Sequence, residues 1–291
     1  MKKILVTGAY GYIGSHVCKI LSEYGYDVHA LDKSISENNI SPYINRFICH
    51  NIKRHFSSDT LLEMHSKYDA IVHLASLIDV EESMKYPEKY ITNNINGTRN
   101  ILDSIETDNF IFASTAAAFT PISVYAQTKL LAEKLVQEKA NRYTIFRFFN
   151  VAGNNGIFKQ IGKSTHLIRI AAETAAGKRS SLQINGTNWD TDDGTCVRDY
   201  IHVMDIVNGI VKSIHFSENK IECIGSGIGY SVKQVINTMK KVSNIDFKVI
   251  DGLPREGDAA VTLLPNGVEK YIDPLYTLED MCLSAFKAEC N

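Results

Sequence analysis

The sequence has no long hydrophobic run and no excess of basic residues. No stretch approaches the roughly 20 consecutive apolar residues that span a bilayer, and the run after Met1-Lys2-Lys3 is only Ile4-Leu5-Val6, too short for a secretory signal. Its 31 basic and 33 acidic residues give a formal net charge of -2, which argues against nucleic acid as a partner. We therefore expect a soluble, cytoplasmic protein with no membrane or nucleic-acid partner.

The cysteines and histidines show no pattern typical of a disulfide framework or a metal site. The six cysteines lie at positions 18, 49, 196, 223, 282 and 290, and no two have C-x-x-C spacing. Without a sign of secretion, reduced thiols are the simpler interpretation. The nine histidines form no metal-ligand cluster in the sequence, so we expect no metal.

Strand and helix patterns alternate through the first half of the chain. Apolar runs predict strands over 4–6, 27–31, 47–49, 70–75, 110–113 and 143–149, and helical spacing predicts helices over 13–24, 93–105 and 125–137. Alternation of this kind is typical of β-α-β units with ligands at the carboxyl ends of parallel strands. After Asn150, residues 153–165 and 176–196 are rich in loop-forming side chains. We expect an α/β fold, with a Rossmann-like doubly wound parallel sheet over 1–150 and a smaller α/β domain over 151–291.

Glycines at 8, 11 and 14 follow the first predicted strand and open the first predicted helix. The first glycine permits a tight turn, the second lets the backbone approach a pyrophosphate, and the third lets helix and strand pack closely. Asp32 ends the second predicted strand, where a carboxylate binds the adenosine ribose and repels a 2′-phosphate. The pattern predicts NAD as the cofactor, although the neighbouring Lys33 leaves some room for NADP.

Tyr125 and Lys129 have Y-x-x-x-K spacing, which places them on one face of a helix. The ordinary pKa of a tyrosine is about 10, and a nearby ammonium together with a positive nicotinamide ring would lower it. Tyr125 is thus a candidate base that removes a hydroxyl proton while hydride leaves the same carbon. Ser114 and Thr115 end the strand just upstream, where a hydroxyl can share that proton.

Several blocks together resemble the extended short-chain dehydrogenase/reductase family and, within it, the UDP-glucose 4-epimerases. The resemblance runs nearly end to end. It rests on VTGAYGYIGSH (6–16), VHLASLIDVEES (72–83), NNINGT (93–98), NFIFAST (109–115), FRFFNVAG (146–153), DGTCVRDYIHVMD (193–205), GSGIGYSV (225–232) and REGD (255–258). It implies a cofactor domain over 1–150, to which a segment near 203–232 returns, and a nucleotide-sugar domain over 151–291.

The resemblance also assigns site residues, position by position. The catalytic residues are Tyr125, Lys129 and Thr115. The cofactor-binding residues are Gly8, Gly11, Tyr12, Ile13, Gly14, Asp32, Lys33, Asn51, Ile52, Leu74, Ala75, Ser76, Asn93, Ser114, Tyr125, Lys129 and Phe148. The substrate-binding residues are Thr115, Tyr125, Asn150, His166, Leu167, Gln183, Asn185, Arg198, Arg255, Asp258 and Thr262.

The implied activity is NAD-dependent inversion of C4 of a UDP-hexose such as UDP-galactose. Tyr125 takes the 4-hydroxyl proton while NAD takes hydride, the transient 4-keto sugar turns over, and hydride returns to its other face. Arg198 and Arg255 suit the diphosphate because guanidinium groups bind it bidentately. The NAD is regenerated and is expected to stay bound.

The chain departs from the family pattern at a few positions. Only residues 116–124 separate Thr115 from Tyr125, so a loop has been lost, and it contains Phe119 in place of a tyrosine. Val151 stands where proline is common. Asn51 stands where an aspartate usually meets adenine, and Asn185 where an aromatic usually packs on uracil, which removes a stacking face. Thr262 falls where a larger tyrosine narrows the hexose pocket in some members, so we expect 2-acetamido sugars to be tolerated.

Other functions on the same fold stay open. A 4,6-dehydratase or a decarboxylase typically has an acidic residue just beyond the catalytic hydroxyl, where this chain has Ala116-Ala117-Ala118. A UDP-pentose epimerase and a non-catalytic NAD-binding protein are the remaining alternatives. Family members pair as homodimers through the helices that correspond to 93–105 and 123–138. The candidate contact residues are Leu130, Leu131, Leu135 and Val136, which packing against the sheet explains equally well.

Overall fold

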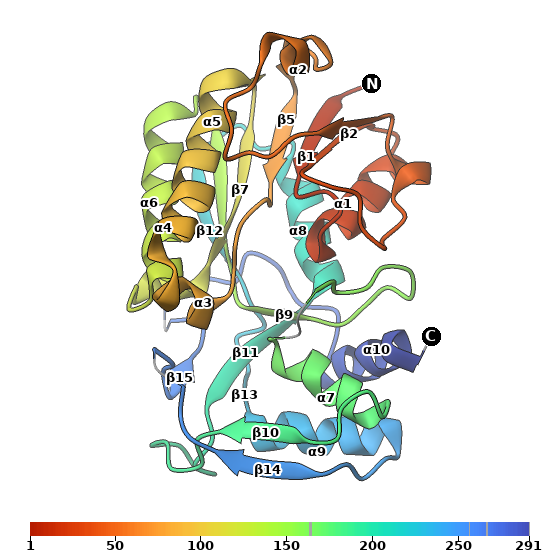
Figure 1. Ribbon diagram of the computed structural model, residues 1–291, viewed down its shortest axis with the longest axis vertical. Helices are drawn as coiled ribbons and strands as arrows, with labels where there is room; N and C mark the ends of the chain where they lie inside the picture. Colours follow the sequence, from red (N-terminus) through yellow and green to blue (C-terminus); the bar gives the residue numbers. More distant parts are fainter. Residues whose placement is uncertain (163–164, 256, 266, 291) are drawn as a thin grey trace. The chain divides into compact units, whose positions relative to one another are not determined.

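A computed structural model describes residues 1–162, 165–255, 257–265 and 267–290 (Figure 1). The chain forms two compact units. Unit 1 comprises Met1–Arg147 and Val207–Glu222, and unit 2 comprises Phe148–Ile206 and Cys223–Asn291.

Unit 1 is built on a sheet of seven strands in the order β12-β8-β7-β5-β1-β2-β3. The pairings of β1 with β2 and β5, of β2 with β3 and of β5 with β7 are all parallel. The predicted parallel sheet is therefore confirmed. Its strands are β1 (Lys3–Thr7), β2 (Asp27–Asp32), β3 (Arg46–Cys49), β5 (Ala70–His73), β7 (Phe110–Thr115), β8 (Tyr143–Phe148) and β12 (Lys220–Ile224).

Helices cover both faces of this sheet. In Figure 1, α4 (Pro87–Tyr90), α5 (Gly97–Ser104) and α6 (Val124–Lys139) lie on one face, and α1 (Tyr12–Glu23) and α8 (Val203–Ser213) lie on the other. Strand residues such as Leu5, Ile71 and Phe112 pack with Val136 of α6 in one buried cluster. Smaller elements connect these layers: η1 (Ser41–Tyr43), α2 (Ser58–Leu62), β4 (Lys67–Tyr68), α3 (Val80–Lys85), β6 (Glu106–Thr107) and η3 (Ala116–Phe119).

The helix predicted over 93–105 begins earlier and is not uniform. Pro87 occupies its first turn, where the missing N–H of proline costs nothing, and a π-helical segment, η2 (Ile91–Asn96), joins α4 to α5. Segments of this kind are frequent at functional sites. This one contains Asn93, a predicted cofactor residue.

Unit 2 combines short strands with three longer helices. β11 (Val197–His202) pairs with β9 (Asn150–Ala152), β13 (Gly229–Ser231) and β15 (Val261–Thr262). A separate parallel pair joins β10 (Leu182–Asn185) to β14 (Val249–Gly252), so the loop expected over 176–196 contains a strand. β10 and β14 are far apart in the sequence, so a local pattern does not predict that they pair. The helices α7 (Leu167–Ala175), α9 (Val232–Ser243) and α10 (Leu278–Cys290) share a core that includes Ala172, Met239 and Met281.

Candidate active site

The glycine loop has no room for side chains. Gly8 has a φ of +68°, and a Cβ on it would lie 2.8 Å from the Ala75 backbone nitrogen. A Cβ on Gly14 would lie 2.1 Å from the carbonyl oxygen of Gly8, inside any tolerable contact. Because β1 and β5 are neighbours in the sheet, this turn and residues 74–76 lie together at their carboxyl ends. That is the point at which the strand order reverses, where doubly wound folds bind ligands.

The start of α1 and the end of β2 complete the phosphate and ribose end of the site. Gly11 is the N-cap of α1 and provides no side-chain cap, so this helix N-terminus has the character of an anion-binding site. The Asp32 carboxylate accepts hydrogen bonds from the backbone nitrogens of Tyr10 (3.0 Å) and Lys33 (2.7 Å), which fix its orientation. Burial raises the pKa of Asp32, and these backbone donors oppose that rise. Tyr12 and Ile13 form the first turn of α1.

Asn51 and Ile52 follow β3. The Asn51 Oδ1 accepts from the Lys53 backbone nitrogen at 3.2 Å, which holds the turn. Ile52 is buried against Gly97, where a Cβ would lie 2.7 Å from Cδ1 of Ile52.

A buried asparagine joins three parts of the predicted cofactor site. Asn94 Oδ1 accepts from Ser76 Oγ (3.1 Å) and from Asn93 Nδ2 (3.0 Å), and Asn94 Nδ2 donates to Thr128 Oγ1 of α6 at 3.2 Å. The loop after β5, the segment η2 and α6 are thereby connected. Asn93 was predicted as a cofactor residue and Asn94 was not, although the position of Asn94 inside the NNINGT block was an available signal.

Thr115 and Tyr125 meet at the end of β7. Thr115 is the last residue of β7 and Tyr125 lies in the first turn of α6, and the Thr115 hydroxyl is near enough to the phenol to lower the pKa of Tyr125. The Thr115 hydroxyl also accepts from the Ala117 backbone nitrogen at 3.2 Å. The short segment between them folds as η3 and ends at Ser123, whose side chain caps α6. The structure thus brings together two of the three predicted catalytic residues despite the shortened loop.

Lys129 lies one turn further along α6 and is 3% exposed, with its Nζ 4.2 Å from the centroid of the Phe112 ring. Burial lowers the pKa of Lys129 to about 7, and the charge of Glu133 opposes this shift. From the sequence, Lys129 and a positive nicotinamide ring are together expected to lower the pKa of Tyr125. In the protein without a cofactor, burial raises the pKa of Tyr125 to about 12, and the Thr115 hydroxyl opposes this rise.

Glu133 is a further buried charge on the same face of α6, and it was not among the residues predicted from the sequence. Its carboxylate, 1% exposed, accepts from Arg147 Nη2 at 2.6 Å and Nε at 3.0 Å, and from the Ser114 hydroxyl. The Arg147 guanidinium lies 4.7 Å from the Phe119 ring centroid in η3. Ser114, predicted as a cofactor residue, therefore directs its hydroxyl to Glu133. The spacing of Glu133, four residues after Lys129, was the available signal.

Arg198, Asp258 and Thr262 lie together in unit 2. Arg198 and Thr262 are partners in the β11–β15 pair, and Arg198 Nη2 lies 3.6 Å from Asp258 Oδ1. Arg198 Nη1 also donates to the carbonyl oxygen of Val197 at 2.9 Å.

Asn185 holds the second predicted arginine. With its amide oxygen turned toward Arg255, Asn185 accepts from Nε at 2.9 Å and from Nη2 at 3.1 Å. The side chain that replaces the expected aromatic thus binds a guanidinium instead. Gln183 lies on the same strand, β10, against Gly252.

The remaining predicted residues are distributed over unit 2. Asn150 begins β9 and donates from Nδ2 to the carbonyl oxygen of Asp199 at 3.0 Å. Phe148, the last residue of β8, is buried. His166 and Leu167 are the N-cap and first residue of α7. None of the helices in the described part of the chain has both the length and the apolar character needed to cross a membrane.

Comparisons with known proteins agree with this arrangement. Residues 4–223 match the model of the NAD dependent epimerase/dehydratase family. A UDP-glucose 4-epimerase of Rhizobium meliloti is 32% identical over 97% of this chain and 95% of its own length.

Two solved structures are similar along their whole length. The UDP-Glc/GlcNAc 4-epimerase of Campylobacter jejuni is 35% identical with a TM-score of 0.81 and covers 99% of both chains. The UDP-glucose-4-epimerase of Stenotrophomonas maltophila, with bound NAD and formylated UDP-arabinopyranose, is 26% identical with a TM-score of 0.87, over 99% of this chain and 98% of that one. The chain belongs to the NAD-dependent epimerase/dehydratase family.

Proposed function

We propose that this protein is an NAD-dependent epimerase that inverts C4 of a UDP-hexose, interconverting UDP-galactose and UDP-glucose. The observation that carries the proposal is that the Thr115 hydroxyl lies near the Tyr125 phenol, one helical turn before the buried Lys129. A positioned hydroxyl, a phenol and an ammonium are the groups that a reversible alcohol oxidation requires. The relatives in the same family are named for that reaction.

The residues of unit 1 fit NAD. The glycine turn lets backbone approach a pyrophosphate, because a Cβ at Gly8 or Gly14 would strike backbone atoms. Asp32 is held in place at the end of β2, where it suits a ribose diol and repels a 2′-phosphate. We infer that Gly8, Gly11, Gly14, Asp32, Ser76 and Asn93 bind NAD, with Asn94 positioning the last two. When bound, the nicotinamide supplies hydride transfer and positive charge.

The residues of unit 2 fit a nucleotide diphosphate. Arg198, beside Asp258, and Arg255, held by Asn185, present two guanidinium groups of the kind that bind phosphate oxygens in pairs. We infer that these residues, with Asn150, hold the UDP portion while the sugar turns over.

Tyr125 acts as the base in this proposal. In its phenolate form, the Tyr125 side chain accepts the proton of the sugar 4-hydroxyl. Thr115 stabilises that phenolate by donating a hydrogen bond to it. Because burial raises the pKa of Tyr125 to about 12, the phenolate forms only when positive charge is nearby. Lys129 supplies such a charge when it is protonated, and the charge of Glu133 favours that form by opposing the fall in the pKa of Lys129.

The direct test is to incubate purified protein with UDP-galactose, without added NAD, and to resolve the products by NMR. We expect UDP-glucose to form up to the equilibrium ratio. Removal of the general base typically costs about 10²–10⁴-fold in rate, so Tyr125→Phe should lose most of the activity while still binding NAD. No product from the unchanged protein, even with NAD supplied, would contradict the proposal.

A second substrate class follows from Thr262. The Campylobacter jejuni protein, 35% identical to this chain, is described as a UDP-Glc/GlcNAc 4-epimerase. We propose that Thr262 leaves space for a 2-acetamido group, so that UDP-N-acetylglucosamine is also converted. Thr262→Tyr should abolish that conversion and spare UDP-glucose; equal loss of both activities would refute a role in selectivity.

A UDP-pentose is the competing substrate, since the Stenotrophomonas maltophila structure holds formylated UDP-arabinopyranose. Adding UDP-xylose to the same NMR assay distinguishes a UDP-pentose substrate from a UDP-hexose substrate.

We further propose a cytoplasmic homodimer that pairs through α5 and α6. Leu131 is 49% exposed and suits such a contact, whereas Val136 is fully buried and does not.

A further inference from the structure

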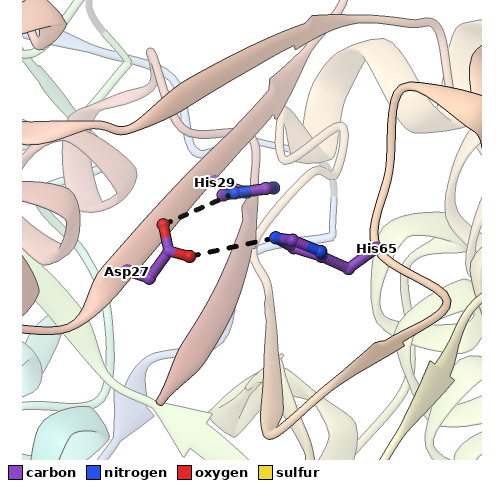
Figure 2. A group of neighbouring side chains, drawn as sticks. All are labelled: Asp27, His29 and His65. Atoms are coloured by element: carbon purple, nitrogen blue, oxygen red, sulfur yellow. Dashed lines mark ion pairs between the residues drawn. The ribbon is translucent and has the colours of Figure 1, made fainter. Parts of the chain in front are cut away.

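Three side chains that could ligate a metal converge at the opposite end of the sheet from Asp32. Asp27 is the first residue of β2 and His29 the third, so the period-two alternation of a strand places both on one face. His65 comes from the turn between α2 and β4 and points toward the same carboxylate (Figure 2). All three belong to unit 1, and none is used in the proposed reaction.

The distances suit a small cation better than hydrogen bonds. His29 Nε2 lies 3.5 Å from Asp27 Oδ1, and His65 Nε2 lies 3.8 Å from Asp27 Oδ2. Strong N–H···O bonds are about 2.7–3.2 Å long, whereas ligands about 2.1 Å from a tetrahedral zinc ion lie about 3.4 Å apart. One ligand atom from each residue lies within 4.8 Å of the other two, so modest side-chain rotations bring all three to a shared ion.

We propose that Asp27, His29 and His65 bind a divalent transition-metal ion of the zinc type. Two imidazoles and one carboxylate form a recurrent donor set for such ions. The Asp27 and His65 side chains are 21% and 33% exposed, so the ion can enter and water can supply a fourth ligand. Bound there, the ion links the turn at His65 to the start of β2.

A hydrogen-bond partner on the other ring nitrogen orients His29 for metal binding. Its Nδ1 lies 3.0 Å from the Tyr68 hydroxyl, so Nδ1–H can donate to that oxygen and leave a lone pair on Nε2, which faces Asp27. Metal-bound histidines usually have such a second partner.

Two cations face the cluster and compete with the metal. Lys3 Nζ lies 3.4 Å from His65 Nδ1, and donation from the ammonium places the ring proton on Nε2, the atom that would bind the ion. Arg46 of β3 contributes a second positive charge near His29. Metal binding therefore requires Lys3 to turn away, and loss of the Lys3 charge should tighten it. The prediction of no metal used sequence spacing alone, which does not bring residue 65 to β2.

The test is zinc affinity of the whole protein, measured by competition with a chromogenic chelator. We expect His65→Gln and Asp27→Asn to bind at least about tenfold more weakly than the unchanged protein. His55→Gln, an exposed histidine outside the cluster, is the matched control and should bind as the unchanged protein does. Lys3→Gln should bind more tightly, and this gain does not depend on a variant that weakens folding.

Cobalt(II) spectra identify the ligand set. Nitrogen and oxygen ligands predict d–d bands without thiolate-to-metal charge transfer, and those bands should be lost in His65→Gln. Charge-transfer bands would assign the metal to the exposed thiols of Cys49 or Cys290 and overturn the proposal. The proposal would also be overturned if the unchanged protein did not bind zinc. Equal zinc affinities of the unchanged protein, His65→Gln and Lys3→Gln would overturn it as well.

Discussion

Lys129 and Glu133 are ionisable side chains that lie almost fully inside unit 1, at 3% and 1% exposure. Charges so deeply buried are costly unless they are paired and hydrogen-bonded. Glu133 has the Arg147 guanidinium and the Ser114 hydroxyl as partners, while Lys129 has the Phe112 ring and the nearby charge of Glu133. The two residues form one buried group that holds the predicted catalytic helix face in place.

Glu133→Gln should therefore destabilise the protein, because it leaves Arg147 and Lys129 without a compensating charge. Breaking a buried pair costs about 3–5 kcal/mol, a value we expect to see in the free energy of unfolding measured with urea. Glu81→Gln breaks the exposed Lys85–Glu81 pair and serves as the control, with no appreciable change expected. An effect of Glu133→Gln as small as the control's would show that Glu133 does not compensate these charges.

His73 makes stability depend on pH. It is 1% exposed and bonded to the hydroxyls of Thr7 (2.7 Å) and Thr98 (3.0 Å), and burial lowers the pKa of His73 to about 3. Between pH 6.5 and 3 the unfolded chain binds a proton that the folded chain does not, so the free energy of unfolding falls as pH falls. The contribution is at most about 1.4 kcal/mol per pH unit.

The check is urea unfolding across that pH range. His73→Gln should lose this part of the slope, whereas His215→Gln, at an exposed position, should keep it. Identical slopes in all three proteins would contradict the assignment to His73.

At the scale of elements, the conformation of the turn after β1 depends most strongly on particular residues, the glycines at positions 8 and 14. Its glycines were assigned from spacing, and the structure supplies the reason, since added Cβ atoms would strike Ala75 or the Gly8 carbonyl. The alternating apolar runs likewise predicted the parallel strands, because a strand buried on both faces leaves a continuous hydrophobic signal. The π-helical segment η2 and the contacts of Asn94 depend on distant partners and were not predicted.

Gly8→Ala should lower both stability and NAD retention. At Gly8 an added Cβ combines two costs, a positive φ and a contact 2.8 Å from the Ala75 backbone nitrogen. At Gly25 the φ is +76° but no atom lies within 4 Å of the added Cβ, so Gly25→Ala tests the backbone strain alone. Strain of that kind costs about 1–2 kcal/mol, so Gly8→Ala should exceed this value in urea unfolding and release NAD. Equal effects of the two substitutions would show that close packing at Gly8 is unimportant.

At the scale of the whole molecule, the chain enters unit 1, leaves it after Arg147 and returns to it at Val207. β12 joins the edge of the large sheet next to β8, which is far away in sequence. A pass along the sequence detects local periodicity but not which distant strands pair, so β12 and the β10–β14 pair were not predicted as strands. The substrate residues were assigned from the family resemblance, and their roles stay predictions.

The proposed homodimer is also tested at this scale. Leu131→Glu places a charge on the exposed face of α6, so light scattering after size exclusion should give a dimeric mass for the unchanged protein and a monomeric mass for the variant. Lys134→Glu, at an exposed position of the same helix, controls for the added negative charge. A monomer in all three samples would contradict the dimer, and a dimer in Leu131→Glu would place its interface elsewhere.

The central claim is that hydride leaves C4 of the sugar and returns to it without exchange with water. Its most direct test is UDP-galactose deuterated at C4, incubated with the protein in ordinary water and followed by NMR. We predict UDP-glucose that keeps deuterium at C4, and conversion that is slower by about 10²–10⁴-fold in Tyr125→Phe. Deuterium lost to solvent would contradict hydride transfer through bound NAD, and conversion by Tyr125→Phe at the unchanged rate would contradict the role given to the phenol.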